Sequence, residues 1–387
     1  MTASENRHIA PAQTKLLASA PCSLLLHRPP MNPTPALPIP VTLLSGFLGA
    51  GKTTVLNALL NQPQGRRFAV VENEFGAVNI DSQLLSRQPG GLVELTNGCV
   101  CCTVSADLVR GLRDLAAQRA AGRLAFDWIV IETTGLADPG AVAQTFFAAP
   151  ELRDDFMLDG IVVVVDALHA NGQLDQHRVV QRQVGFADRL LLAKCDLVDA
   201  AAISSLSERL RCINPRAAQQ LLQNGHAEPG SLLGIGGFNL NASLLAADSA
   251  SLSPARFAPM PAPAAISWSR RPAAHEDEIS SFLLEAGEVD LEQIGLFVQS
   301  LVDELGDELL RYKGILAIPD ESRKLIFQGV QRVAGFAYGE PWAPGQTRTS
   351  RIVLIGNRLP VARLRATFQA AAAAANGRPA ATRMPAT

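Results

Sequence analysis

A chain of 387 residues, of which 48% are hydrophobic and 18% charged, is long enough for two domains with buried cores, which excludes a wholly disordered protein. The formal net charge is −2, and no lysine and arginine cluster resembles a nucleic-acid-binding surface, so we expect no nucleic-acid partner. No apolar run approaches the roughly 20 residues that span a bilayer, and a secretory signal is lacking. We therefore expect a cytoplasmic protein without membrane contact.

The pattern along the chain predicts five segments. Residues 1–40 contain prolines and no sustained periodicity, which predicts a disordered extension. Apolar strand-like runs then alternate with helical runs over residues 41–226, which predicts an α/β domain with a mostly parallel sheet. The runs that read as strands are Val41–Leu44, Arg67–Val71, Leu92–Leu95, Asp127–Ile131, Gly160–Asp166 and Arg189–Ala193. A stretch rich in Gly, Ala, Ser and Pro predicts a linker over 227–265, followed by a smaller α+β domain over 266–372 and a disordered tail over 373–387.

The stretch Gly46-Phe47-Leu48-Gly49-Ala50-Gly51-Lys52-Thr53 fits the phosphate-binding loop G-x-x-x-x-G-K-[ST], between a predicted strand and a predicted helix. Its glycines let backbone N–H groups curl around phosphate oxygens. We expect Lys52 to reach the β- and γ-phosphates and the Thr53 hydroxyl to hold Mg²⁺. The nucleotide-binding residues predicted here are Gly46, Gly49, Ala50, Gly51, Lys52, Thr53 and Thr54.

Two further strand ends carry residues suited to a nucleotide. Glu132 and Gly135 follow the run 127–131, where a carboxylate can orient Mg²⁺ or the attacking water and a glycine N–H can meet the γ-phosphate. Lys194-Cys195-Asp196 lies where guanine-binding proteins carry [NST]-K-x-D, so Asp196 would accept from guanine and Lys194 would cover the base. Ala193 replaces the leading polar residue, which leaves the guanine preference less certain.

Three cysteines within four residues, Cys99, Cys101 and Cys102, are suited to a soft metal such as Zn²⁺ rather than to a disulfide framework. Three thiolates leave a fourth coordination position open. Glu72 and Glu74 follow the strand 67–71, so either carboxylate is a candidate for that position.

Five segments together resemble the CobW-type family of P-loop GTPases, relatives of the nickel-insertion GTPases for urease and hydrogenase. The segments are Gly46–Thr53, Glu72–Gly76, Asn97–Cys102, Glu132–Asp138 and Leu192–Asp196. The similarity spans residues 41–370, because Leu310–Gly314 and Phe327–Gln331 resemble the family's C-terminal domain. The resemblance, closest to the short zinc-binding bacterial members, implies a GTP-dependent metallochaperone for zinc, or in some relatives cobalt. The histidine-rich segment of many relatives is reduced here to His226 and His275, which argues against metal storage.

The sequence thus predicts a slow GTPase that converts GTP and water to GDP and phosphate and couples this to metal transfer to a client protein. Its predicted catalytic residues are Lys52, Thr53 and Glu132, and its predicted cofactors are GTP, Mg²⁺ and Zn²⁺, with Co²⁺ or another divalent transition metal as the alternative cargo. Two other functions stay open: a metal buffer or sensor in which nucleotide only sets the conformation, and a small-molecule P-loop kinase. The oligomeric state is also open.

Overall fold

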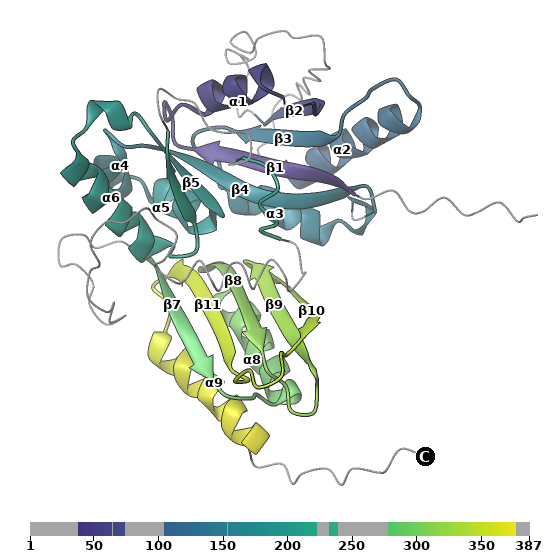
Figure 1. Ribbon diagram of the computed structural model, residues 1–387, viewed down its shortest axis with the longest axis vertical. Coiled ribbons are helices and arrows are strands. Elements are labelled where there is room, and N and C mark those ends of the chain that lie inside the picture. The colour runs from purple at the N-terminus through teal and green to yellow at the C-terminus, as the bar shows by residue number, and fades with distance from the viewer. Residues whose placement is uncertain are drawn as a thin grey trace, which may run out of the picture. The chain divides into compact units, whose positions relative to one another are not determined.

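The structure is a computed structural model that describes residues 38–63, 65–73, 104–152, 154–222, 232–238 and 278–376. Within the compact unit that begins at Pro38, the described chain forms two β-sheets with associated helices (Figure 1). The predicted strand Leu92–Leu95 and most of the predicted extension (1–40) and tail (373–387) lie outside the described residues. Both disordered segments were predicted a few residues too long, because a strand begins at Ile39 and a helix continues to Asn376. No described helix is both long and apolar enough to cross a membrane.

The first sheet has six strands in the order β2-β3-β1-β4-β5-β6, and every neighbouring pair is parallel. The strands are β1 (Ile39–Gly46), β2 (Phe68–Asn73), β3 (Trp128–Thr133), β4 (Phe156–Asp166), β5 (Arg189–Ala193) and β6 (Ala218–Leu221). The five predicted runs that lie among the described residues each overlap one of these strands. The predicted parallel α/β domain is confirmed.

Helices cover both faces of this sheet, which explains why its central strands are apolar throughout. The helices are α1 (Lys52–Asn61), α2 (Val104–Ala120), α3 (Pro139–Ala148), α4 (Ala170–Gln176), α5 (Arg178–Phe186) and α6 (Ala200–Ile213). Successive strand residues face opposite sides. On β1, Leu44 packs in one core with Val55 and Leu56 of α1, whereas Leu43 packs in a second core with α2, α3, α5 and α6.

The second sheet has five antiparallel strands in the order β10-β9-β8-β11-β7. The strands are β7 (Ile279–Ala286), β8 (Leu309–Leu316), β9 (Arg323–Val330), β10 (Val333–Pro341) and β11 (Ser350–Asn357), and the helices are α8 (Leu291–Leu305) and α9 (Val361–Asn376). Phe297 of α8 and Phe368 of α9 share a core with one face of the sheet. Leu310 and Ile355, on the other face, belong to the same core as α5 of the first domain. The predicted α+β character of the second domain is therefore confirmed.

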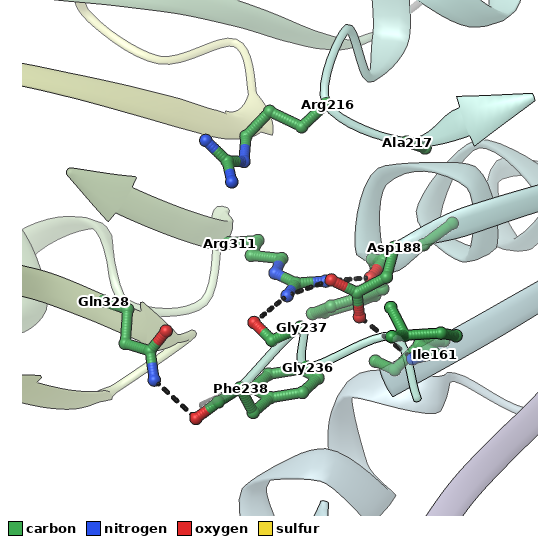
Figure 2. Close-up of polar contacts among 12 residues, drawn as sticks. Ile161, Asp188, Arg216, Ala217, Gly236, Gly237, Phe238, Arg311 and Gln328 are labelled. Atoms are coloured by element: carbon green, nitrogen blue, oxygen red, sulfur yellow. Dashed lines mark hydrogen bonds and ion pairs between the residues drawn. The ribbon is translucent and has the colours of Figure 1, made fainter. Parts of the chain in front are cut away.

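A buried ion pair fastens the second sheet to the first domain (Figure 2). The Arg311 guanidinium, on β8, lies 2.5 Å from the Asp188 carboxylate and donates to the carbonyl of Gly237 at 3.0 Å. It also stacks over the ring of Phe238, whose carbonyl accepts from Gln328 at 2.9 Å. Gly237 and Phe238 thus contact the second domain, whereas Leu232 and Leu233 pack in the core beside α1. Both pairs belong to the stretch predicted to be a linker.

Strand β10 is absent from the sequence-based prediction. It contains glycines and ends in Pro341, residue types that are depleted in strands. It forms nevertheless, because a tight turn at Gln331, with φ of 50°, folds it back as an antiparallel partner of β9.

Candidate functional site

The phosphate-binding loop joins β1 to α1 at the carboxyl edge of the parallel sheet. Gly46 ends β1 with φ of 141°, and a Cβ there would lie 2.4 Å from the carbonyl oxygen of Val164, so the position requires glycine. Gly49, Ala50 and Gly51 continue the loop, and Lys52, Thr53 and Thr54 begin α1. The structure therefore places the residues of the predicted motif between the end of β1 and the first turn of α1.

The Lys52 ammonium lies within this loop. Its Nζ donates to the carbonyl oxygens of Gly46 at 3.1 Å and Phe47 at 3.3 Å. The charge is therefore held beside the first turn of α1, whose free N–H groups add a partial positive charge. Such a combination favours binding of the phosphates of a nucleotide.

Oxygen atoms suited to a hard cation gather next to the loop. Thr53 Oγ1 donates to Glu132 Oε1 at 3.3 Å, and the Glu132 side chain is buried at the end of β3. Two residues later, the buried Thr134 hydroxyl has no hydrogen-bond partner within the described part of the chain. Hydroxyl and carboxylate oxygens are the ligands that Mg²⁺ prefers. The residues present thus fit the predicted ion, which when bound would neutralise charge on the β- and γ-phosphates.

The turn that follows β3 touches the phosphate loop directly. Ala137 N donates to Thr134 O at 3.0 Å and closes the turn. A Cβ on Gly135 would lie 2.5 Å from the backbone N of Leu48, so only glycine allows this approach. Gly135, predicted to meet the γ-phosphate, is therefore beside the loop that would hold that phosphate.

Lys194 brings a third segment to the same loop. It follows β5 in a left-handed conformation, with φ of 57°, and its Nζ donates to the carbonyl of Gly49 at 2.9 Å. The ammonium also lies 2.6 Å from Asp166 Oδ2, at the end of β4. Burial alone would raise the pKa of Asp166, but hydrogen bonds from Lys194 and His169 offset it and lower that pKa overall. Asp166 therefore stays ionised and fixes the lysine over the loop.

Asp196, the predicted guanine-reading residue, is exposed and follows Lys194 on a short 3-10 turn (Cys195–Leu197). Its carboxylate makes no hydrogen bond or ion pair with another described residue. Its contact with a base stays a prediction.

The predicted cargo ligands fall largely outside the description. Cys99, Cys101, Cys102 and Glu74 are not among the described residues. The backbone of Glu72 is described, and on β2 it lies in register beside Glu132 of β3. In the described ranges no group of three or more His, Cys, Asp or Glu side chains could hold a metal ion.

Two residues of this site were missed from the sequence. Asp166 ends an apolar strand, the same feature that drew attention to Glu132, so it could have been found. Gln183 of α5 donates to the carbonyls of Gly135 and Ala137 at 3.0 and 3.1 Å, and no sequence motif marks it.

Comparison with known proteins identifies the architecture. Residues 40–220 match the family described as CobW/HypB/UreG, nucleotide-binding domain, and residues 279–372 match the cobalamin synthesis protein cobW C-terminal domain. The chain is 41% identical over 337 residues to the zinc chaperone YjiA of Escherichia coli, covering 86% of this chain and 98% of that protein. The chain belongs to the CobW family. The predicted resemblance is thereby confirmed.

Other CobW proteins support the assignment. The zinc chaperone CobW of Pseudomonas aeruginosa is 31% identical over 83% of this chain and 88% of its own length. A crystal structure of zinc-bound YjiA GTPase from E. coli aligns with a TM-score of 0.67 and 35% identity, covering 86% of this chain and 98% of that one. An equally similar structure is a zinc-bound YjiA variant in which one glutamate and two cysteines are replaced by alanine.

Proposed function

We propose that this protein is a GTPase that binds zinc and delivers it to a metal-dependent client protein, with GTP hydrolysis weakening its hold on the metal. The observation that carries the proposal is the meeting of three distant segments at one loop: Thr53 contacts Glu132, Gly135 contacts Leu48, and Lys194 contacts Gly49. Such a cluster at the carboxyl edge of a parallel sheet is where α/β proteins bind nucleotides. The names of the CobW relatives, zinc chaperones and GTPases, support the cargo and the reaction.

The groups around the phosphate-binding loop have separate roles in the proposed hydrolysis. Lys52 and the N-terminus of α1 stabilise negative charge on the phosphates as it shifts toward the β–γ bridging oxygen. Thr53 and Glu132 would hold Mg²⁺ or orient the attacking water, and the Gly135 N–H would meet the γ-phosphate. Catalysis here rests on positioning and charge, and we expect hydrolysis by the protein alone to be slow.

The cargo site rests on the sequence. Cys99, Cys101 and Cys102 supply three thiolates, and Glu72 or Glu74 supplies a fourth ligand. Because β2 pairs with β3, the backbone of Glu72 lies in register beside Glu132, which is part of the proposed nucleotide site. A change at the γ-phosphate can therefore alter the metal's fourth ligand. The glutamate and two cysteines replaced in the YjiA variant are the same residue types.

The direct test of this function is turnover measured with GTP and with ATP, with and without Zn²⁺, alongside the metal content of the purified protein. We expect GTP hydrolysis and one tightly bound zinc per chain. Zinc binding without any turnover would instead favour the buffer or sensor function. Transfer of phosphate to a small molecule would favour the kinase.

Guanine selection gives a second test. Asp196→Asn should reduce GTP affinity by about 5–150-fold, because two guanine donors lose their carboxylate acceptor at a cost of about 1–3 kcal/mol. The same variant should bind xanthosine triphosphate better than the parent does, because xanthine presents an acceptor at that position. Fluorescence titration with both nucleotides measures the shift. Equal GTP and ATP affinities in the parent protein would contradict the assigned role of Asp196.

A further inference from the structure

The turn Thr134–Ala137 is held from two sides. On one side Gly135 packs against the backbone of Leu48 in the phosphate loop. On the other side Gln183 of α5 donates from Nε2 to the carbonyls of Gly135 at 3.0 Å and Ala137 at 3.1 Å. One side chain therefore holds two carbonyl groups of the turn, those of Gly135 and Ala137.

The amide of Gln183 is suited to this task and is hidden from water. The side chain is 1% exposed, and only its nitrogen can face two carbonyl oxygens, since its oxygen would repel them. The Gln183 Oε1 atom is buried without a hydrogen-bond partner among the described residues. A buried polar atom without a partner is rare in native proteins, so the unpaired oxygen calls for an explanation beyond stability.

Helix α5, which carries Gln183, is itself held firmly. Asn214 Nδ2 donates to the carbonyls of Val184 at 2.9 Å and Ala187 at 2.8 Å, at the end of the helix. Gln181 lies about 200° around the helix from Gln183. Its Oε1 accepts from the backbone N of Glu278 at 3.0 Å and of Ile279 at 3.2 Å, where β7 begins. Gln183 thus projects from an element anchored on its opposite side.

We propose that Gln183 is a positioning residue for GTP hydrolysis, which holds the Thr134–Ala137 turn so that the Gly135 N–H meets the γ-phosphate. The inference rests on the proposed GTPase function. This role predicts that GTP and GDP depend differently on the turn. GTP contacts the turn through its γ-phosphate, whereas GDP has no γ-phosphate and makes no such contact. A misplaced turn should therefore weaken the γ-phosphate contact and leave GDP binding intact.

The test compares Gln183→Met with Gln181→Met, two buried glutamines of the same helix that each lose their hydrogen bonds. For Gln183→Met we expect kcat for GTP to fall about 10–100-fold. KM for GTP should rise about tenfold, because KM follows the affinity for the bound triphosphate when hydrolysis is slow. The ratio of affinities for a non-hydrolysable GTP analogue and for GDP should fall by about tenfold or more. Gln181→Met should lower the melting temperature comparably but keep the parental kcat and the parental ratio.

Gln183→Glu provides a second variant of nearly the same shape in case the methionine variant does not fold. A carboxylate repels both carbonyls, whereas a protonated carboxyl donates to one of them. Its kcat relative to the parent should therefore be low at pH 8 and partly recovered at pH 6. If the folded Gln183 variants keep the parental kcat and the parental analogue-to-GDP affinity ratio, the role of Gln183 is overturned while the proposed GTPase function stands. A parent protein that hydrolyses no GTP would overturn the proposed function, and the inference with it.

Discussion

Lys52→Ala is expected to reduce kcat for GTP hydrolysis by at least about 10²–10³-fold, the loss found when one preorganised donor is removed from developing negative charge. The structure gives the reason, since the Lys52 ammonium is held by two loop carbonyls beside the N-terminus of α1. No other described lysine lies in the loop itself. Phosphate release from GTP measures the loss.

The fold of Lys52→Ala should survive, because the Lys52 side chain is only partly buried. A circular dichroism melt checks this. Lys324→Ala is the matched control: Lys324 lies over the ring of Trp342 in the second domain and should leave kcat unchanged. Full GTP turnover by a folded Lys52→Ala protein would contradict the assignment of residues 46–53 as the phosphate-binding loop.

Arg311→Met is expected to lower the free energy of unfolding by about 3–5 kcal/mol, because it leaves the buried Asp188 carboxylate without its cation. The side chains of Arg311 and Asp188 are 7% and 10% exposed. Asp188 Oδ2 would keep its bond from Ile161 N, at 2.9 Å (Figure 2). One hydrogen bond does not compensate for a lost ion pair, and the carbonyls of Phe186 and Gly237 would also lose their donor.

Urea unfolding followed by tryptophan fluorescence measures this effect. Arg351→Met is the control, since Arg351 pairs with Glu285 on the same sheet with side chains 59% and 50% exposed. Exposed pairs contribute little, so its unfolding midpoint should barely change. Equal midpoints for the two variants would show that the Arg311 pair does not fasten the sheets together.

Local sequence patterns were sufficient for the parts of the site that depend on a strand end. Lys52, Thr53, Glu132 and Lys194 follow apolar runs, and parallel strands bring their carboxyl ends to one edge. The motifs therefore pointed to residues that the structure brings into contact, such as Thr53 with Glu132 and Lys194 with the phosphate-binding loop.

Other parts depend on tertiary contacts that no local pattern encodes. Gln183 is one polar residue of an amphipathic helix, and its role follows only from where α5 packs. Residues 232–238 are rich in glycine, which predicts a linker, yet the Asp159 carboxylate binds the backbone N–H groups of Ile235 and Gly236. Arg311, too, has no sequence feature that points to Asp188.

The central claim is that the nucleotide controls the hold on zinc, and a competition titration with a chromogenic chelator tests it most directly. It is run with a non-hydrolysable GTP analogue and with GDP, using the parent and the Cys99, Cys101, Cys102→Ser triple variant. We expect one tight site per chain that is tighter with the analogue, is lost in the triple variant, and weakens as pH falls below neutrality because protons compete for the thiolates. Parental zinc affinity in the triple variant, or equal affinity with the analogue and with GDP, would contradict the account.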